Sequence, residues 1–215
     1  MSEKYLEPYR EAADKHGSDF EVTLWANRQT QEVRFDVFME MCYLGGKRIL
    51  DAGCSRGDFG AYLLKKGIGG WHKKGGYVGV DGLEEVIAYA KEREIFAGSE
   101  AEFVCGDLVA DPEVMRVGEP QVVVISGTLN TMSDAEVYKV LEGAWAGASE
   151  TLLFNFLSDQ VAKGTPKQGW PARRLPTLDL LRWAFEKTPL VNMRQDYFEH
   201  GHDATIMMVK AKQAK

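Results

Sequence analysis

Three aspartates each follow a short apolar run, at the point where a buried strand would end. They are Asp51, Asp81 and Asp107. Because the carboxyl ends of parallel strands meet at one edge of a sheet, we expect the three carboxylates to lie close together. A carboxylate accepts hydrogen bonds from hydroxyl and amino groups and attracts a cation. Together they indicate a site for a nucleoside that carries positive charge and no phosphate.

A glycine-rich turn follows the first of these runs. Gly53, Gly57 and Gly60 permit backbone conformations or close approaches that a side chain would block. The helix expected next would direct its free N–H groups and positive dipole end at the same turn. Turns that bind dinucleotides have glycine at the first, third and sixth positions and no carboxylate beside the phosphates. Here the third position is Ser55 and Asp51 stands close by, which disfavours pyrophosphate.

Strand-like and helix-like segments alternate along the chain before a closing pair of strands. The expected strands cover about 48–51, 77–81, 103–107, 121–127, 152–157, 190–197 and 204–209. The expected helices cover about 27–44, 59–67, 83–93, 133–145 and 178–186, with a brief one from 111. We therefore predict an α/β fold with a doubly wound, mostly parallel, seven-stranded, Rossmann-like sheet and a terminal antiparallel hairpin.

The first 46 residues differ from the rest in having aromatic side chains scattered among charges. We predict an N-terminal helical cover segment over 1–46 and a main unit over 47–215, within one compact domain. Trp25, Phe35 and Phe38 are candidates for a lid that excludes water. Additional cover for the core is the alternative.

Composition excludes several classes of function. The formal net charge of -6 argues against general binding to nucleic acid or to an anionic membrane surface. No apolar run approaches the roughly 20 residues that span a bilayer, and no signal peptide is visible. The three widely spaced cysteines fit reduced thiols in the cytoplasm. His200 and His202 hint at a metal, but no third ligand is identifiable, so we predict none.

The run Leu50-Asp51-Ala52-Gly53-Cys54-Ser55-Arg56-Gly57 resembles the first motif of class I S-adenosylmethionine-dependent methyltransferases. That motif reads acid, any residue, Gly, any, Gly, any, Gly, and Ser55 replaces its middle glycine. Tyr77 to Asp81 resembles the second motif, whose acid binds the ribose. Gly106-Asp107-Leu108 resembles the third, whose acid meets the adenine amine, and Ser126-Gly127 matches the position that lines the methionine part. The resemblance extends from about residue 47 to 209.

The resemblance implies S-adenosyl-L-methionine as cofactor and S-adenosyl-L-homocysteine as product. It assigns cofactor binding to Asp51, Gly53, Cys54, Ser55, Gly57, Asp81, Gly82, Leu83, Gly106, Asp107, Leu108, Ser126 and Gly127. Each of these residues could have a structural role instead of binding the cofactor. The glycines could serve only turn and packing geometry, Asp51 and Asp81 could cap the segments that follow them, and Asp107 could be a turn residue.

Candidate catalytic residues lie outside these motifs. His200 and His202 stand in the hairpin connection, and either could act as a base near neutral pH, exposed turn histidines being the alternative. Asn130 could orient an acceptor or serve the turn before Ser133. Many methyltransferases that act on amide or base nitrogens carry an Asn/Asp-Pro-Pro-Tyr/Phe sequence after the fourth strand, and this chain has Ser126-Gly127-Thr128-Leu129-Asn130-Thr131 there instead. This difference lowers the probability of adenine- or glutamine-directed N-methylation.

Candidate acceptor-binding residues are Trp25 and, in the long loop 158–176, Trp170, Arg173 and Arg174. The two arginines could receive a carboxylate or phosphate of the acceptor, and a solvated basic loop is the alternative. We expect methyl transfer to an O- or N-nucleophile of a small molecule, which could be anionic. An NAD(P)-dependent oxidoreductase and a non-catalytic cofactor-binding protein are the competing functions. The oligomeric state is left open.

Overall fold

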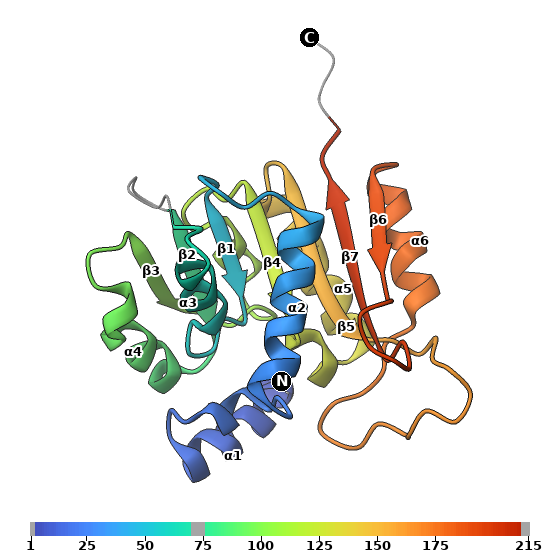
Figure 1. The fold of residues 1–215 in the computed structure, drawn as a ribbon, viewed down its shortest axis with the longest axis horizontal. Coiled ribbons are helices and arrows are strands. Elements are labelled where there is room, and N and C mark those ends of the chain that lie inside the picture. The colour runs from blue at the N-terminus through green and yellow to red at the C-terminus, as the bar shows by residue number, and fades with distance from the viewer. Residues whose placement is uncertain (1–2, 70–75, 212–215) are drawn as a thin grey trace.

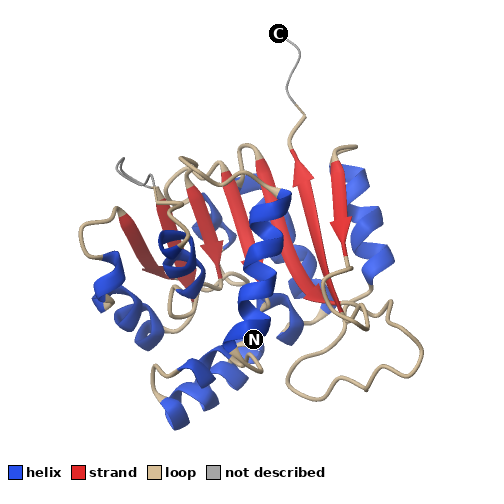
Figure 2. Cartoon of the chain, in the orientation of Figure 1, coloured by secondary structure: helices blue, strands red, loops and turns tan. Residues whose placement is uncertain are grey.

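The computed structural model describes residues 3–69 and 76–211, which form one sheet with helices packed against it (Figures 1 and 2). The predicted segments 1–46 and 47–215 include a few residues outside this part, at 1–2, 70–75 and 212–215. The strands are β1 (Ile49–Ala52), β2 (Tyr77–Asp81), β3 (Ala101–Cys105), β4 (Val122–Ser126), β5 (Thr151–Leu157), β6 (Val191–Arg194) and β7 (Asp203–Val209).

The strand order is β3-β2-β1-β4-β5-β7-β6. β7 is antiparallel to both of its neighbours, and the other neighbouring pairs are parallel. The predicted α/β fold and its terminal hairpin are therefore confirmed. β6 runs in the same direction as β5, so the connection from β6 to β7 lies at the carboxyl edge of the parallel strands.

The helices are α1 (Glu7–His16), α2 (Arg28–Met41), α3 (Asp58–Lys65), α4 (Glu84–Glu92), α5 (Asp134–Gly147) and α6 (Thr177–Lys187). Local signals fix two of their starts. The Asn27 side chain accepts a hydrogen bond from the Thr30 N–H at 2.9 Å, and Ser133 and Glu136 form a capping box. The brief helix expected from 111 is a 3-10 helix, Pro112–Arg116, capped by Asp111.

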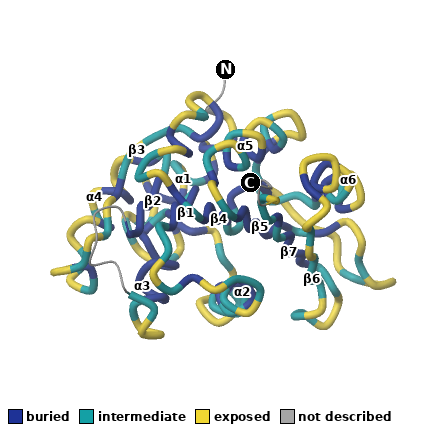
Figure 3. Tube along the Cα trace, turned by 90° about the horizontal axis from the view of Figure 1, so that it is seen from above, coloured by how far each residue is buried: buried dark blue, intermediate teal, exposed yellow. Residues whose placement is uncertain are grey.

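Two hydrophobic cores lie on opposite faces of the sheet, because successive strand residues point to opposite sides. Leu50 and Val123 pack with α5 and α6, whereas Ile49 and Val124 pack with α2 and α3. Figure 3 shows these helix pairs on the two sides of the sheet. The cores hold the strands in register, and so they fix the positions of the strand ends.

Two regions reach the carboxyl edge of the parallel strands. One is the N-terminal segment, which consists of 3-10 helix Glu3–Tyr5, α1, 3-10 helix Phe20–Thr23 and α2, the last of which packs on a face of the sheet. The other is the loop 158–176, whose ends are joined by a bridge between Ser158 and Leu175 (Figure 1). Among the described helices, none has the length and apolar character to cross a membrane.

Candidate functional site

A cavity of about 450 Å³ opens at the carboxyl edge of β1, β2 and β4. Its wall combines the ends of these strands with the N-terminal segment, the loop 158–176 and the connection from β6 to β7. Strand ends of a doubly wound sheet are the usual ligand position. Ten of the thirteen predicted cofactor residues line it: Asp51, Gly53, Cys54, Ser55, Asp81, Gly82, Leu83, Leu108, Ser126 and Gly127.

The turn after β1 is built from left-handed backbone conformations. Gly53 has a φ of 80° and Gly57 a φ of 71°, and Ser55, although not a glycine, has a φ of 46°. A Cβ on Gly53 would lie 2.0 Å from the Thr128 Oγ1 atom, so only glycine fits there. The Ser55 N–H donates to the Asp81 Oδ2 atom at 2.8 Å, which helps to hold this serine in its strained conformation.

Asp81, at the end of the second motif, is hydrogen-bonded to the turn of the first motif. Besides the bond from Ser55, its Oδ1 atom accepts a hydrogen bond from the Leu83 N–H at 3.0 Å. Burial raises the pKa of Asp81 to about 6, although these backbone donors oppose the rise. Each carboxylate oxygen has a further lone pair, so the side chain can still accept hydroxyl groups of a ligand.

Asp51 lies deeper, with only 2% of its surface exposed. Its Oδ2 atom accepts a hydrogen bond from the Tyr77 hydroxyl at 2.6 Å. Burial raises the pKa of Asp51 to about 7; the Tyr77 bond lowers it, and the charges of Asp81 and Asp58 raise it further. A cation in the cavity would favour the ionised carboxylate, so the site suits a positively charged ligand.

Asp107 is placed differently from the other two aspartates. Its Oδ1 atom accepts hydrogen bonds from the Tyr5 hydroxyl at 2.9 Å and from the N–H groups of Val109 and Ala110 at 2.8 and 2.9 Å. Asp107 is not among the lining residues, whereas Leu108 beside it is. Asp107 therefore stabilises a turn and anchors the N-terminal segment, and its contact with an adenine amine stays a prediction.

Gly57 and Gly106 also lie outside the cavity wall. A Cβ on Gly57 would lie 2.8 Å from the ring of Phe103, and a Cβ on Gly106 would lie 2.8 Å from the side chain of Val114. The absence of a side chain at these two positions is required by packing behind the site.

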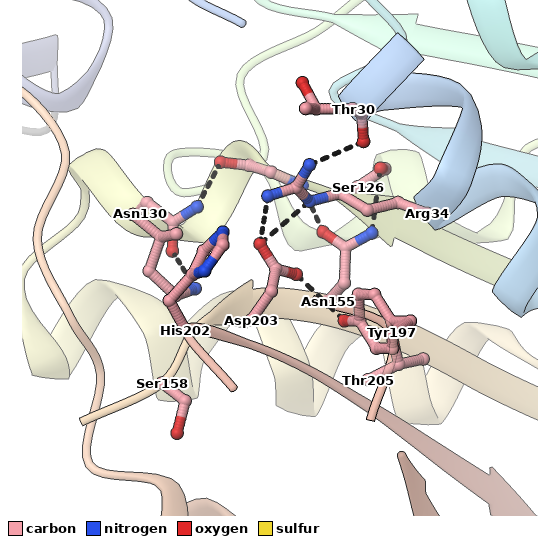
Figure 4. A network of polar contacts seen from close by, with 12 residues as sticks. Thr30, Arg34, Ser126, Asn130, Asn155, Ser158, Tyr197, His202, Asp203 and Thr205 are labelled. Atoms are coloured by element: carbon pink, nitrogen blue, oxygen red, sulfur yellow. Dashed lines mark hydrogen bonds and ion pairs between the residues drawn. The ribbon is translucent and has the colours of Figure 1, made fainter. Parts of the chain in front are cut away.

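Asn130 lines the cavity, but both ends of its amide are engaged with the backbone (Figure 4). Its Nδ2 atom donates to the Gly127 carbonyl at 3.1 Å, and its Oδ1 atom accepts from the Leu157 N–H at 2.8 Å. On the other side, Asn155 Oδ1 accepts from the Gly127 N–H at 2.8 Å. These contacts indicate that Asn130 and Asn155 fix the turn after β4.

Some of the predicted acceptor-binding and catalytic residues line the cavity, and the others lie outside it. Trp25, Trp170 and His202 line the cavity, whereas His200 is exposed and does not. Arg173 donates to the Met132 carbonyl at 2.6 Å and pairs with Asp134 at 2.7 Å.

Arg174 donates to the carbonyls of Ser158 and His202 at 2.9 and 3.2 Å. Neither Arg173 nor Arg174 is among the residues that line the cavity. Both arginine side chains hold the loop 158–176 in place rather than facing the ligand space.

A buried ion pair that the sequence did not reveal joins α2 to β7. The Arg34 guanidinium donates from Nε to the Asp203 Oδ2 atom at 2.8 Å, pairs with the same oxygen through Nη2, and donates from Nη1 to the Thr30 carbonyl at 2.6 Å. The Tyr197 hydroxyl donates to Asp203 Oδ1 at 2.9 Å and lies 2.9 Å from the Thr205 hydroxyl. Figure 4 shows this network.

The same arginine packs against two aromatic rings. Its guanidinium carbon lies 4.4 Å from the Trp25 ring centre and 4.6 Å from that of Phe198. Phe198 in turn stacks on His202 at 4.7 Å. Burial lowers the pKa of His202, as do the charges of Arg34, Arg174 and His200, while Asp203 raises it. His202 is therefore a neutral imidazole near pH 7 and can accept a proton.

Two sequence signals could have led to the missed residues. Arg34 falls next to Phe35 and four residues before Phe38, on the buried face of its helix. Asn155 stands between Phe154 and Phe156 in a fully buried strand. A polar side chain at a buried position needs a partner, so each predicts a polar contact, although neither identifies the partner. No group of three metal-ligating side chains is found in the described ranges.

Comparison with known proteins relates part of the chain to one family. Residues 49–147 match the family model described as a methyltransferase domain. Over this stretch, which is slightly less than half of the chain, the predicted resemblance to methyltransferases is confirmed. A search of curated proteins found no match.

Solved structures share the fold of this chain at low identity. Magnesium protoporphyrin IX methyltransferase from Synechocystis, solved with bound SAM, is 15% identical over 96% of this chain and 97% of its own, with a TM-score of 0.65. An O-methyltransferase family protein from Burkholderia thailandensis is 16% identical over 99% of this chain and 64% of its own, with a TM-score of 0.73. The small RNA methyltransferase HEN1 is 10% identical over 86% of this chain and 25% of its own, with a TM-score of 0.64.

Proposed function

We propose that this methyltransferase transfers the methyl group of S-adenosylmethionine to an O- or N-nucleophile of a small molecule, in the cytoplasm. One observation carries the proposal. Asp51, Ser55 and Asp81, which come from two motifs, converge in a single cavity at the strand ends. One buried and one half-buried carboxylate, together with a left-handed turn, suit a ligand with a cationic centre and ribose hydroxyls better than they suit a pyrophosphate.

The residues that line the cavity match the ribose, the methionine part and the base of this cofactor. Asp81 would accept the ribose hydroxyls and Asp51 would balance the positive charge of the methionine part, while Leu83 and Leu108 offer apolar surface to the base. The cofactor supplies an activated methyl group, and the chain binds it, orients the acceptor and excludes water. The N-terminal segment supports the last role because Tyr5, Leu6 and Trp25 all line the cavity.

We assign the role of general base to His202 rather than His200, because only His202 lines the cavity. Asn130 has its amide engaged with Gly127 and Leu157, which favours a role in positioning the turn. A small acceptor is favoured over nucleic acid by the volume of the cavity, about 450 Å³, and by the net charge of -6. The proposed cytoplasmic setting rests on the three free thiols, Cys42, Cys54 and Cys105.

Calorimetric titration tests the proposed cofactor. S-Adenosylmethionine and S-adenosylhomocysteine should bind, and NADH should not. Binding of NADH alone would instead support the oxidoreductase. A screen for transfer of a labelled methyl group into a metabolite extract then separates an enzyme from a non-catalytic binding protein, because the latter would bind the cofactor and label nothing.

A further inference from the structure

We propose that the acceptor is an uncharged, planar molecule that presents a hydroxyl group to His202. This inference rests on the proposed function and concerns the end of the cavity beyond the cofactor residues, which we call the acceptor end. Its wall is formed by Trp25, Gln31, Phe35, Trp170, Pro171 and His202. The proposal follows from the charges, the surfaces and the proton acceptor at this end.

The charges of the lining residues disfavour an anionic acceptor. Arg34 is the one lysine or arginine among the described residues that line the cavity, and it is paired with Asp203 and bonded to the Thr30 carbonyl. Asp51 and Asp81 line the same cavity, as does Asp58, whose charge is balanced by an ion pair with Arg93. A carboxylate or phosphate would therefore lose its hydration without gaining a free cationic partner from the protein, which is costly.

The surfaces favour a flat acceptor. A Cβ on Gly127 would lie 2.4 Å from the Trp25 ring, so this ring lies directly against the end of β4. The Arg34 guanidinium packs on the same ring, which fixes its orientation. Trp170 also lines the cavity, yet 77% of its surface is exposed. A large aromatic surface left open beside a cavity is typical of a binding site for an apolar face.

His202 gives the acceptor end a fixed proton acceptor. Its ring stacks on Phe198, and its carbonyl accepts hydrogen bonds from the Ser158 N–H at 3.1 Å and from Arg174. The charged or titratable groups that act on it are Asp203, Arg34, Arg174 and His200. Three of these four favour the neutral imidazole, which can take a proton from a hydroxyl group.

The proposed reaction conserves atoms and charge. The acceptor oxygen bonds to the methyl carbon while the carbon–sulfur bond breaks, and the electron pair of that bond stays on sulfur. The hydroxyl proton passes to His202 and later to solvent. The positive charge of the sulfonium is thus replaced by that of a transient imidazolium, next to the buried carboxylate of Asp203.

Binding of three matched probes to the protein saturated with S-adenosylhomocysteine tests the charge and the shape. The probes are 2-naphthol, 2-naphthoate and decahydro-2-naphthol, and the measurement is an NMR titration. We expect 2-naphthol to bind about tenfold more tightly than either of the others, because it alone is both uncharged and flat. Equal or tighter binding of 2-naphthoate, or no binding of 2-naphthol, would overturn the proposal.

Substitutions then locate the probe. Trp170→Ala should weaken 2-naphthol binding about fivefold or more, as expected for the loss of a stacking surface. Tyr43→Ala is the matched control, because Tyr43 is an exposed aromatic residue that is not among the cavity residues. Equal effects of the two changes would place the probe elsewhere and contradict the proposal.

The contact with His202 has its own test. In the unaltered protein 2-naphthol should bind about tenfold more tightly than 2-methylnaphthalene, and His202→Leu should remove this advantage. An advantage that survives the substitution would show that the hydroxyl meets another group. Calorimetric titration with S-adenosylhomocysteine accompanies every variant. Failure of cofactor binding would reject the proposed function, whereas failure of the probe pattern with intact cofactor binding rejects only the acceptor class.

Discussion

The two ends of the cavity are built in different ways. The cofactor end is made of turns that directly follow β1, β2 and β4, and backbone N–H groups there donate to side-chain oxygens of Asp81 and Asn155. The acceptor end is made of side chains that come from both ends of the chain and from the loop 158–176, held together by the Arg34 network. The sheet alone positions the first, whereas the second depends on long-range side-chain pairing.

The largest effect expected from this difference concerns Arg34. Arg34→Met leaves Asp203 buried without its cation, so it should lower the free energy of unfolding by about 3–5 kcal/mol. Urea denaturation measures this. Arg194→Met is the matched control, because Arg194 also pairs across to α2, with Glu40, but at the surface. It should cost about 0–1 kcal/mol. Similar losses for the two variants would mean that the buried pair does not organise the acceptor end.

The next effect should be confined to the cofactor end. Gly53→Ala places a Cβ against Thr128, so it should weaken S-adenosylhomocysteine binding about 100-fold, measured by calorimetric titration. Gly98→Ala is the control for backbone strain, since Gly98 has a similar φ of 75° but nothing within 4 Å of the added atom. If both variants bind equally well, the close packing of the turn is not what shapes the site.

Substitutions of Asp81 and Asp107 test which of these two aspartates contacts the cofactor. Asp81→Ala should weaken S-adenosylhomocysteine binding by about 1.5–3 kcal/mol, through lost hydrogen bonds to a charged group. Asp107→Ala should have a smaller effect, because Asp107 is bonded to Tyr5 and to the backbone and does not line the cavity. The reverse order would restore the adenine contact that the sequence motif predicts.

A further effect is a dependence on pH. The folded, ligand-free protein holds protons on Asp51 and Asp81 up to pKa values of about 7 and about 6, whereas the unfolded chain loses them near the ordinary aspartate pKa of 3.8. The folded state therefore binds more protons between these limits, so its stability should fall as the pH rises from about 4 to about 7. Chemical denaturation across this range measures the slope.

Cofactor binding should show the opposite trend. The cationic cofactor favours the ionised carboxylates, so binding should release protons and become about tenfold tighter between pH 6 and pH 8. Titrations in buffers of different ionisation enthalpy measure the released protons. Their absence at pH 6.5, together with unchanged affinity, would mean that Asp51 and Asp81 are already ionised before the cofactor binds.

The sequence predicted the cofactor end better than the acceptor end for a physical reason. The bounds of β2, the capping box at Ser133 and the aspartates at two strand ends follow from local pattern and strand direction. The pairing of Arg34 with Asp203 and the bond from Tyr5 to Asp107 depend on how distant segments come to lie, which periodicity does not encode.

The loop arginines illustrate the same limit. Arg173 and Arg174 have the charge that an anionic acceptor would need, and the sequence offered no sign that carbonyl groups and Asp134 would occupy them. Charge can be read from residue type, but whether that charge is free depends on the tertiary contacts.

The contact between Arg34 and Asp203 joins residues 169 positions apart, and this has a consequence for biosynthesis. A domain generally folds as a unit once its chain has been synthesised. Every residue of the turns after β1, β2 and β4 precedes residue 132 and is synthesised early. Arg34 of α2 can pair with Asp203 only after β7 has left the ribosome. A chain that stops short of residue 203 would contain the cofactor turns but could not close the acceptor end.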